Sequence, residues 1–258
     1  MQAKVPAAAR LQVPTKYVVC RRADDDDSIT EEDVREQNRW ANEAFGGRSP
    51  WERMGFDTAR PASVDMQISF ALVDITIVTD GECASKGFVN TELLHKYNPS
   101  PSEHLTIVII TNDTSGILGQ TAYPFDVPED SPENMVVVSS VGVRGYARRF
   151  DTPMLYDEGD TVVHEIGHWL GLYHTFESGC STDEMENEGD WVDDTNPEKF
   201  PHYDCTVDMS CGQVDPVHNF MDYSPDTCMV GFSEGQQRRA WCVFEHDRPT
   251  LYKMSLTR

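Results

Sequence analysis

Short apolar segments in the N-terminal part of the chain predict β-strands. They lie at 16–20, 67–78, 105–111, 118–123 and 135–139. Apolar and polar residues partly alternate in 67–78, whereas 105–111 and 135–139 are nearly all apolar and predict strands buried on both faces. We expect 118–123 to be a short strand at an edge of the sheet.

Apolar residues at helical spacing and residues that favour helix N-termini predict the helices. The expected helices lie at about 31–45, 91–97, 159–172 and 233–246. Ser28 or Thr30 would cap the first of them, and Ser233 would cap the last, which we expect to close the fold.

The succession of strands and helices stops before the segment 175–232, which is rich in Gly, Asp and Pro and predicts loops. A chain of 258 residues fits one domain. We therefore expect an α/β (α+β) fold with a flexible leader at 1–14 and one domain over 15–258. Its two subdomains would span about 15–174 and 175–258.

The charge balance excludes some classes of partner. The chain has 21 Lys and Arg residues against 44 Asp and Glu residues, a net charge of −23. Binding to nucleic acids needs clustered positive charge, so this balance argues against a nucleic-acid partner, and anionic membrane surfaces are disfavoured for the same reason. The longest apolar run, 105–110, is far shorter than the roughly 18 residues of a membrane-spanning helix.

Cysteine usage indicates an oxidising compartment. Four cysteines lie in the predicted loop region, at Cys180, Cys205, Cys211 and Cys228. None of them belongs to a CxxC pair. This disfavours a four-thiolate zinc site and favours two disulfides, with free thiols in a cytosolic protein as the alternative. Four cysteines allow three pairings. The N-terminus has no apolar signal-peptide core, so we expect the signal and any pro-segment of a secreted protein to be absent from this chain.

The segment 161–174 (TVVHEIGHWLGLYH) carries the chemistry. His164 and His168 are one helical turn apart, so both imidazoles would lie on one side of the helix and share a metal ion. Gly171 would end the helix, and the returning chain would bring His174 as a third ligand. Three protein nitrogens leave a fourth position for water, which is typical of a catalytic zinc site. A chance set of core histidines is the alternative.

Glu165 follows the first histidine but lies at another angle around the helix. It can therefore hydrogen-bond the zinc-bound water instead of the metal. We predict that this carboxylate takes the proton of the water as it attacks a carbonyl, and later passes the proton to the leaving amine.

Two further segments carry a family resemblance. Gly189–Thr195 reads GDWVDDT, and His218–Cys228 reads HNFMDYSPDTC. An H-E-x-x-H-x-x-G-x-x-H motif followed by a turn that contains Met221 resembles the metzincin clan of metallopeptidases. Together with HEIGHWLGLYHTF and Gly179-Cys180, these segments resemble the pappalysin family, and its ulilysin-like and cytophagalysin-like secreted members most. The specific motifs cover about residues 160–242.

The resemblance implies a metzincin-type zincin. Such a fold has a twisted mixed sheet and the active-site helix in its N-terminal subdomain, and a loop-rich, disulfide-stapled C-terminal subdomain that ends in a helix. It also implies that Met221 forms a hydrophobic floor under the zinc, and that the Tyr223 hydroxyl reaches the zinc or the oxyanion of the tetrahedral intermediate. The implied disulfides are Cys180–Cys211 and Cys205–Cys228, and Cys20–Cys83 is a guess.

An acidic run between residues 181 and 204 has two interpretations, a solvated loop or a calcium site. Relatives in the family bind calcium near here, and a long loop beside an active site needs an ordering ion. The spacing is not that of an EF-hand, so no ligands are assigned. The acidic residues are Asp183, Glu184, Glu186, Glu188, Asp190, Asp193, Asp194, Glu198 and Asp204.

Substrate binding is predicted at the edge strand 118–123, to which an extended peptide would add by backbone hydrogen bonds. Several pappalysin relatives prefer Arg or Lys just after the cut, through an acid near the Met-containing turn. Asp226 lies nearby, but Thr227 occupies the position directly before Cys228 where this acid is expected. The sequence therefore leaves a preference for basic residues open.

We predict a secreted, monomeric zinc metalloendopeptidase that hydrolyses peptide bonds in protein or peptide substrates. In this prediction His164, His168 and His174 bind zinc, and Glu165 and Tyr223 act in catalysis. Two alternatives are a pseudo-peptidase that binds peptides without cutting, and a zinc hydrolase of non-peptide amides. The intact catalytic pair argues against the first, and the turn after the zinc motif argues against the second.

Overall fold

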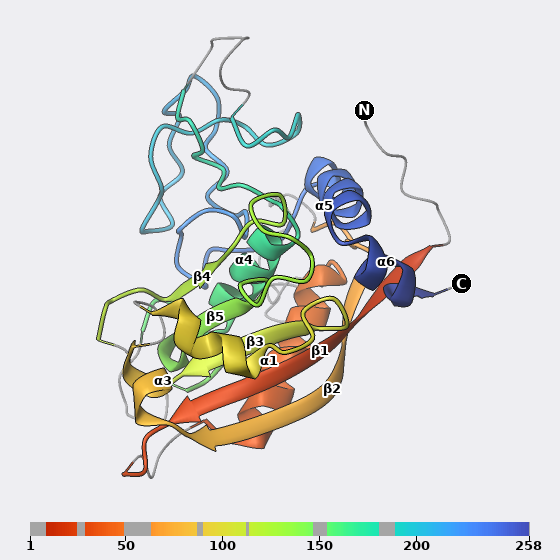
Figure 1. The fold of residues 1–258 in the computed structure, drawn as a ribbon. Helices are drawn as coiled ribbons and strands as arrows, with labels where there is room; N and C mark the ends of the chain where they lie inside the picture. The colour runs from red at the N-terminus through yellow and green to blue at the C-terminus, as the bar shows by residue number, and fades with distance from the viewer. Residues whose placement is uncertain are drawn as a thin grey trace.

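A six-stranded mixed sheet forms the body of the molecule (Figure 1). The computed structural model describes residues 9–24, 29–48, 63–86, 90–111, 114–146, 154–180 and 189–257. Five strands follow one another in the order β2 (Ile68–Thr79), β1 (Arg10–Arg21), β3 (Leu105–Ile110), β5 (Val136–Ser139) and β4 (Gly119–Thr121). The first four are parallel, and β4 pairs with β5 in antiparallel fashion at the edge. Strands β3 and β5 are fully buried, as predicted.

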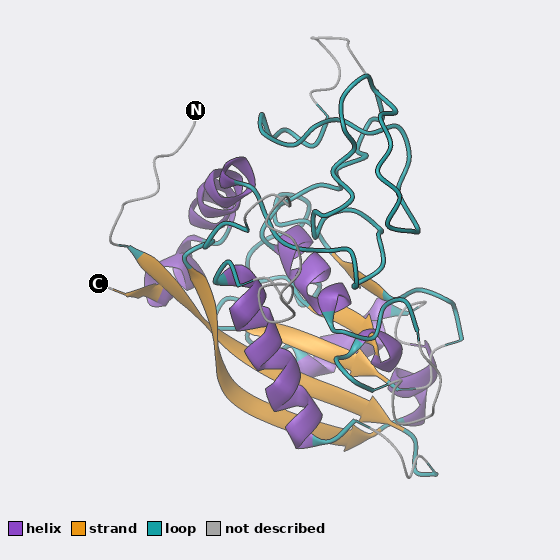
Figure 2. Cartoon of the chain, turned by 180° about the vertical axis from the view of Figure 1, so that it is seen from behind, coloured by secondary structure: helices purple, strands orange, loops and turns teal. Residues whose placement is uncertain are grey.

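Helices cover both faces of the sheet (Figure 2). The remaining elements are α1 (Glu31–Phe45), α3 (Gly81–Lys86), η1 (Thr91–Tyr97), η2 (Ser140–Gly142), α4 (Asp160–Trp169), α5 (Glu234–Asp247), α6 (Pro249–Ser255) and β6 (Leu256–Thr257). Alternate side chains of β1 serve the two faces: Tyr17 and Val19 pack in the larger core with α1 and α4, while Val18 packs with α3 and Leu94 of η1.

The helix predictions hold with changes at their ends. Thr30 caps α1 and exchanges hydrogen bonds with Asp33, and Ser233 caps α5, while Ser28 lies outside the described residues. Helix α4 ends at Trp169, earlier than predicted, because Gly171 reverses the chain with a φ of 88°.

The prediction that one helix after residue 233 closes the fold is wrong. Pro249 starts a further helix, α6, after which β6 pairs with the beginning of β1. That pairing joins the two ends of the described chain, and no local pattern announces it.

The predicted leader over 1–14 is wrong for 10–14, because β1 already begins at Arg10. Leu11 and Val13 are buried and alternate with exposed residues. Pro14 tolerates the strand because β3 joins β1 only from Thr15 onward, so Pro14 pairs with β2 alone. Residues 1–8 lie outside the described part.

Loops stapled by disulfides form the predicted C-terminal subdomain, at the top of Figure 1. The structure contains Cys180–Cys211 and Cys205–Cys228, the pairing that the family resemblance implied, and also Cys20–Cys83 between β1 and α3. Cys242 is free.

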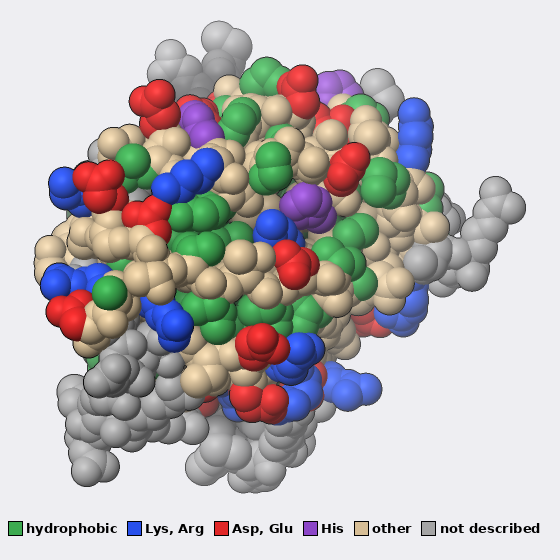
Figure 3. All heavy atoms as spheres, turned by 60° about the horizontal axis from the view of Figure 1, so that its bottom comes forward, with side chains coloured by type: hydrophobic (Ala, Val, Ile, Leu, Met, Phe, Trp, Pro, Cys, Tyr) green, Lys and Arg blue, Asp and Glu red, His purple; other side chains and the backbone are tan. Residues whose placement is uncertain are grey.

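The surface of the described chain shows no simple segregation of charge on the face that Figure 3 presents. Acidic and basic side chains are interspersed there among hydrophobic ones, so the net charge of −23 does not form a continuous acidic surface on that side.

Every helix among the described residues is too short or too polar to span a bilayer.

Candidate active site

Helix α4 and the turn after it place three histidines around one point. His164 and His168 are buried and lie one turn apart on the helix, and the chain reversal at Gly171 returns His174 to them. One ligand nitrogen of each ring lies within 4.8 Å of the others. The Nε2 atoms of His168 and His174 are only 3.0 Å apart. The structure thus brings together the three residues that the motif singled out.

Backbone carbonyls orient two of the rings from behind. The carbonyl oxygen of Phe220 lies 2.7 Å from His164 Nδ1, and that of Leu172 lies 2.7 Å from His168 Nδ1. A carbonyl oxygen can only accept, so each Nδ1 carries the proton and each Nε2 presents its lone pair to the shared point. This is the tautomer that metal-binding histidines adopt.

Burial keeps the three imidazoles neutral. It lowers the pKa of His164 to about 4 and, together with His164, lowers the pKa of His174 to about 3. Burial and the two neighbouring rings also hold the pKa of His168 well below its usual range. Neutral nitrogen lone pairs that face each other at 3.0 Å favour a shared cation. The donor set therefore fits zinc, which three histidines bind in catalytic sites.

Glu165 is buried beside this cluster with one unpaired carboxylate oxygen. The residue is 6% exposed, and Oε2 has no hydrogen-bond partner among the described residues. Burial raises the pKa of Glu165 to about 8. Strand β4 passes close by, since a Cβ atom on Gly119 would lie 2.5 Å from Glu165 Cγ. A buried carboxyl group with a free oxygen and raised proton affinity suits a proton acceptor.

Met221 packs against α4 next to His168. A Cβ atom on Gly167 would lie 2.4 Å from Met221 Sδ, so only glycine leaves room for this contact. Asn219 Oδ1 accepts from the backbone N–H of Met221, and Asn219 also hydrogen-bonds Gln236 at the start of α5. The turn that contains Met221 is thereby fixed between α4 and α5.

Tyr223 lies at the open side of the cluster. Its ring centroid is 4.8 Å from that of His174 and 5.6 Å from that of His164. Burial raises the pKa of Tyr223 to about 12, so the phenol keeps its proton at neutral pH. The Tyr156 hydroxyl donates to the Tyr223 carbonyl oxygen at 2.9 Å, a contact that no sequence motif indicated.

A pocket of about 430 Å³ opens beside Glu165, and three buried aspartates line it, Asp160, Asp222 and Asp226. Asp160 and Asp226 are 1% and 3% exposed. One oxygen of each, Asp160 Oδ2 and Asp226 Oδ1, has no hydrogen-bond donor within the described chain. Burial raises the pKa of Asp226 to about 7, and burial together with Asp226 holds the pKa of Asp160 well above its usual range. The pocket therefore favours a guest that brings positive charge.

Asp226 lines the pocket, whereas Thr227, the residue directly before Cys228, does not. Thr227, at that position, is exposed, and its hydroxyl oxygen lies 4.0 Å from the sulfurs of Cys205 and Cys228. Asp226 instead turns inward, where its Oδ2 accepts the backbone N–H of Glu158 at 2.8 Å. The sequence placed Asp226 near this position but did not indicate that its side chain points inward, because the direction of a side chain in a loop depends on the tertiary fold.

The acidic run is not a uniformly solvated loop. Asp190 is buried, accepts hydrogen bonds from Val192 N and Thr195 Oγ1, and has its pKa raised to about 7 by burial. Asp194 accepts from the backbone N–H of Gly235 at the start of α5. Residues 181–188, which include four of the acids, lie outside the described part.

Comparison with known sequences identifies metalloprotease relatives. The family model described as Pregnancy-associated plasma protein-A, Peptidase_M43, matches residues 118–245. Extracellular metalloprotease 1 of Coccidioides posadasii is 52% identical over 87 residues, which cover 33% of this chain and 30% of that protein. The extracellular metalloprotease of Arthroderma otae is 34% identical over 184 residues, covering 69% of this chain and 65% of that protein. The chain therefore spans less than two thirds of the length of these relatives.

Solved structures establish the fold. Mature mirolysin of Tannerella forsythia, in complex with a cleaved peptide, superposes with a TM-score of 0.78 at 21% identity, covering 97% of this chain and 98% of that chain. A promirolysin mutant gives a TM-score of 0.76 at 20% identity, covering 96% and 86%. The predicted metzincin-type fold is thus confirmed. The matched segment 118–245, which includes α4 and the turn at Met221, is a Peptidase_M43 domain.

Proposed function

We propose that the chain is a secreted zinc metalloendopeptidase. One observation carries this proposal: three neutral histidine nitrogens converge on one point beside the buried carboxylate of Glu165. The names of the extracellular metalloprotease relatives and the disulfides support secretion. The monomeric state and the absence of nucleic-acid or membrane partners stay predictions from the sequence.

When bound by His164, His168 and His174, zinc supplies Lewis acidity, which polarises a carbonyl group and acidifies water. Next to that positive charge Glu165 is in its carboxylate form, and its free Oε2 takes the proton of the attacking water. The same carboxyl group then protonates the leaving amine. The Tyr223 phenol, which keeps its proton, donates a hydrogen bond to the oxygen on which negative charge develops.

Substrate binding is proposed along β4. This strand pairs with β5 on one side, and no other strand of the described chain covers its second edge. An extended peptide can therefore add to β4 by backbone hydrogen bonds, which would carry its scissile bond past Glu165, against which Gly119 packs. Mature mirolysin has been solved with a cleaved peptide, which supports a peptide substrate.

We also propose that the pocket beside Glu165 takes an Arg or Lys side chain of the residue after the cut. Asp160 and Asp226 place two carboxyl groups in the pocket wall, each with one oxygen that lacks a donor among the described residues. A guanidinium or ammonium group would supply both positive charge and hydrogen-bond donors. The proposal thus assigns to Asp226 the preference for basic residues that the sequence left open.

Calcium is proposed as an additional, structural ion near Asp190. Burial raises the pKa of Asp190 to about 7, so a cation beside this carboxyl group would offset the cost of burying its charge. Addition of calcium to zinc-loaded, calcium-depleted protein should raise the melting temperature, and Asp190→Asn should reduce that rise.

A map of cleavage sites tests the main proposal. The protein is incubated with a denatured proteome, with and without a zinc chelator, beside Glu165→Ala, and the new termini are read by mass spectrometry. Cuts that vanish with both the chelator and the variant, and that precede Arg or Lys, support it. A folded, zinc-loaded protein that makes no cuts would favour the pseudo-peptidase, and hydrolysis of small amides alone would favour the amide hydrolase.

A further inference from the structure

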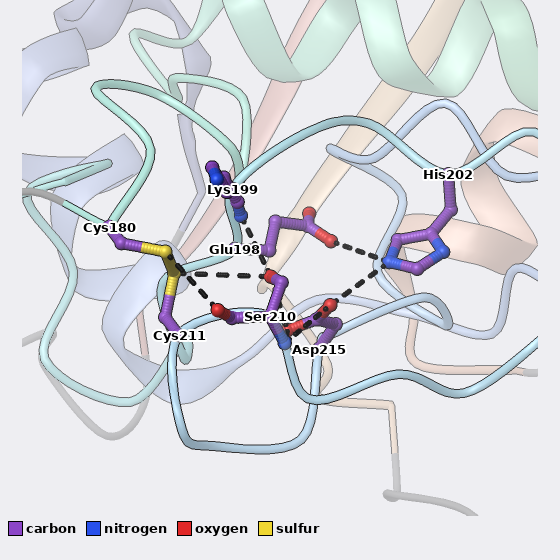
Figure 4. Close-up of a disulfide and its surroundings, with 7 residues drawn as sticks. All are labelled: Cys180, Glu198, Lys199, His202, Ser210, Cys211 and Asp215. Atoms are coloured by element: carbon purple, nitrogen blue, oxygen red, sulfur yellow. Dashed lines mark hydrogen bonds and ion pairs between the residues drawn. A yellow bond between two sulfur atoms is a disulfide. The ribbon is translucent and has the colours of Figure 1, made fainter.

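A second histidine-containing cluster lies in the loops of the C-terminal subdomain, beside the Cys180–Cys211 disulfide (Figure 4). Glu198 and Asp215 approach the same ring nitrogen of His202 from two sides. His202 Nε2 is 3.4 Å from Glu198 Oε2 and 3.2 Å from Asp215 Oδ2. Glu198 is 0% and Asp215 3% exposed, so the cluster is almost closed to solvent.

Surrounding groups hold each member of the cluster in place. Glu198 Oε1 accepts from Thr175 Oγ1 at 2.5 Å, and Asp215 Oδ1 accepts from Ser210 N and Oγ, each at 3.0 Å. The backbone N–H of His202 donates to Asp222 Oδ1 at 3.1 Å. These contacts resemble the outer partners that orient metal ligands, because they leave one atom of each side chain facing the shared point.

Within the part of the chain that the structure describes, no Lys or Arg forms an ion pair with the cluster. Three carboxyl groups, those of Glu198, Asp215 and Asp222, surround one imidazole, which can neutralise at most one of them. Lys199 does not compensate, since its ammonium group lies over the Phe200 ring at 5.3 Å. Glu198 Oε2 has no hydrogen-bond donor within the described residues, although the side chain is buried. A bound cation would satisfy this oxygen and balance the charge.

We propose that Glu198, His202 and Asp215 form a second metal site, specific for zinc-like divalent ions. One ligand atom from each residue lies within 4.8 Å of the other two. The 3.2 Å and 3.4 Å separations match the edge of a tetrahedron around zinc, about 3.4 Å for ligands at about 2.1 Å. An imidazole with two carboxylates is a zinc donor set, whereas calcium prefers oxygen ligands alone.

The site has a structural role. Glu198 hydrogen-bonds Thr175, the residue after His174, and His202 hydrogen-bonds Asp222, the residue after Met221. A metal ion at the cluster therefore clamps the loop between residues 198 and 215 to both segments that frame the proposed catalytic centre. The inference rests on the cluster itself and does not depend on peptidase activity.

Zinc content tests the inference. Protein equilibrated with zinc and then dialysed against metal-free buffer is analysed by plasma mass spectrometry. We expect two zinc ions per chain in the native protein, one in His202→Asn, one in His168→Asn and none in the double variant. His246→Asn, which changes an exposed histidine on α5, is the matched control and should keep two. Anomalous scattering from native crystals at the zinc edge should give a peak between Glu198, His202 and Asp215.

Two results would overturn the inference. The first is a single zinc in the native protein that His202→Asn keeps and His168→Asn loses, which would mean that protons neutralise the cluster. The second is calcium at the cluster in place of zinc. If His202→Asn fails to fold, as judged by circular dichroism, Asp215→Asn provides the same comparison, and the anomalous peak needs no variant. Loss of peptidase activity with both zinc ions present would contradict the proposed function but not this site.

Discussion

The two histidine-containing clusters differ in how the sequence encodes them. The first comes from one helix and the turn after it, so the spacing of His164, His168 and His174 alone predicts that they meet. The second joins Glu198, His202 and Asp215 across a loop whose path depends on a disulfide and on hydrogen bonds to Thr175 and Asp222. A site built on one helix can be predicted from the spacing of its residues. A site assembled from loops can be identified only from the three-dimensional structure.

The clusters also differ in charge. The first offers only neutral nitrogens, with the carboxyl group of Glu165 at its side, whereas the second offers two carboxylates and one imidazole. Three neutral ligands with a free coordination position leave the metal ion strongly electrophilic. Carboxylate ligands in a site closed to solvent neutralise the charge of the ion. The contrast assigns chemistry to the first cluster and structural support to the second, and variants at each cluster should separate the two roles.

The largest effect is expected from His168→Asn. Loss of a central ligand should remove zinc from the first cluster and lower kcat/KM for a peptide by at least about 10³-fold, since several kcal/mol of transition-state stabilisation disappear. His202→Asn should lower the melting temperature but leave the residual activity of folded protein near that of the native chain. Equal loss of activity in both folded variants would contradict the division between the clusters.

Tyr223→Phe should reduce kcat by about 10²-fold with little change in KM, because the hydroxyl acts only when charge develops on the substrate oxygen. Steady-state kinetics with a fluorogenic peptide measure this. Tyr252→Phe on α6 is the control and should have no effect. A large rise in KM at unchanged kcat would show that Tyr223 binds substrate instead.

Asp226→Asn should change specificity more than rate. Removal of one charge from the pocket should lower kcat/KM for substrates with Arg or Lys after the cut by roughly 30-fold, the loss of about 2 kcal/mol from a charged hydrogen bond. Paired peptides with Arg or Leu at that position measure the ratio. Thr227→Asn, at the exposed neighbouring position, should leave the ratio unchanged. An unchanged ratio in Asp226→Asn would show that Asp226 does not determine the preference for Arg or Lys.

Gly167→Ala should have the smallest effect, a loss of about 1 kcal/mol in the free energy of unfolding, because the new methyl group meets only the flexible end of the Met221 side chain. Gly81→Ala is the matched control, since nothing lies within 4 Å of a Cβ atom there. Urea denaturation measures both. Equal free energies of unfolding for the two variants would show that the turn at Met221 shifts to admit the methyl group without loss of stability.

The sequence predicted the parts of the fold that local patterns encode. The apolar runs of β3 and β5, the capping residues Thr30 and Ser233, and the zinc motif each have a local physical cause. The start of β1 was missed because Pro14 is a poor strand residue unless one side is unpaired, and pairing is a tertiary fact. The same holds for β6.

Within the site, the sequence predicted the groups on α4 and the turn at Met221 but not those that reach it from elsewhere. Asp160 and Asp226 meet only because the loop before Cys228 turns inward, and Tyr156 contacts Tyr223 across 67 positions of sequence. Gly119 matters because β4 passes over Glu165, a contact that the edge-strand prediction did not contain. Each of these depends on packing between distant segments, which spacing along one chain does not report.

In the proposed mechanism Glu165 acts as the base, while the histidines alone hold the metal ion at the first cluster. Zinc content and kcat/KM for one peptide, measured on the same preparation of Glu165→Gln, test it most directly. We expect Glu165→Gln to keep the zinc content of the native protein and to lose about 10²–10⁴-fold in kcat/KM. Zinc content equal to that of the native protein with kcat/KM within about twofold of it would contradict the account, because a general base contributes far more than that.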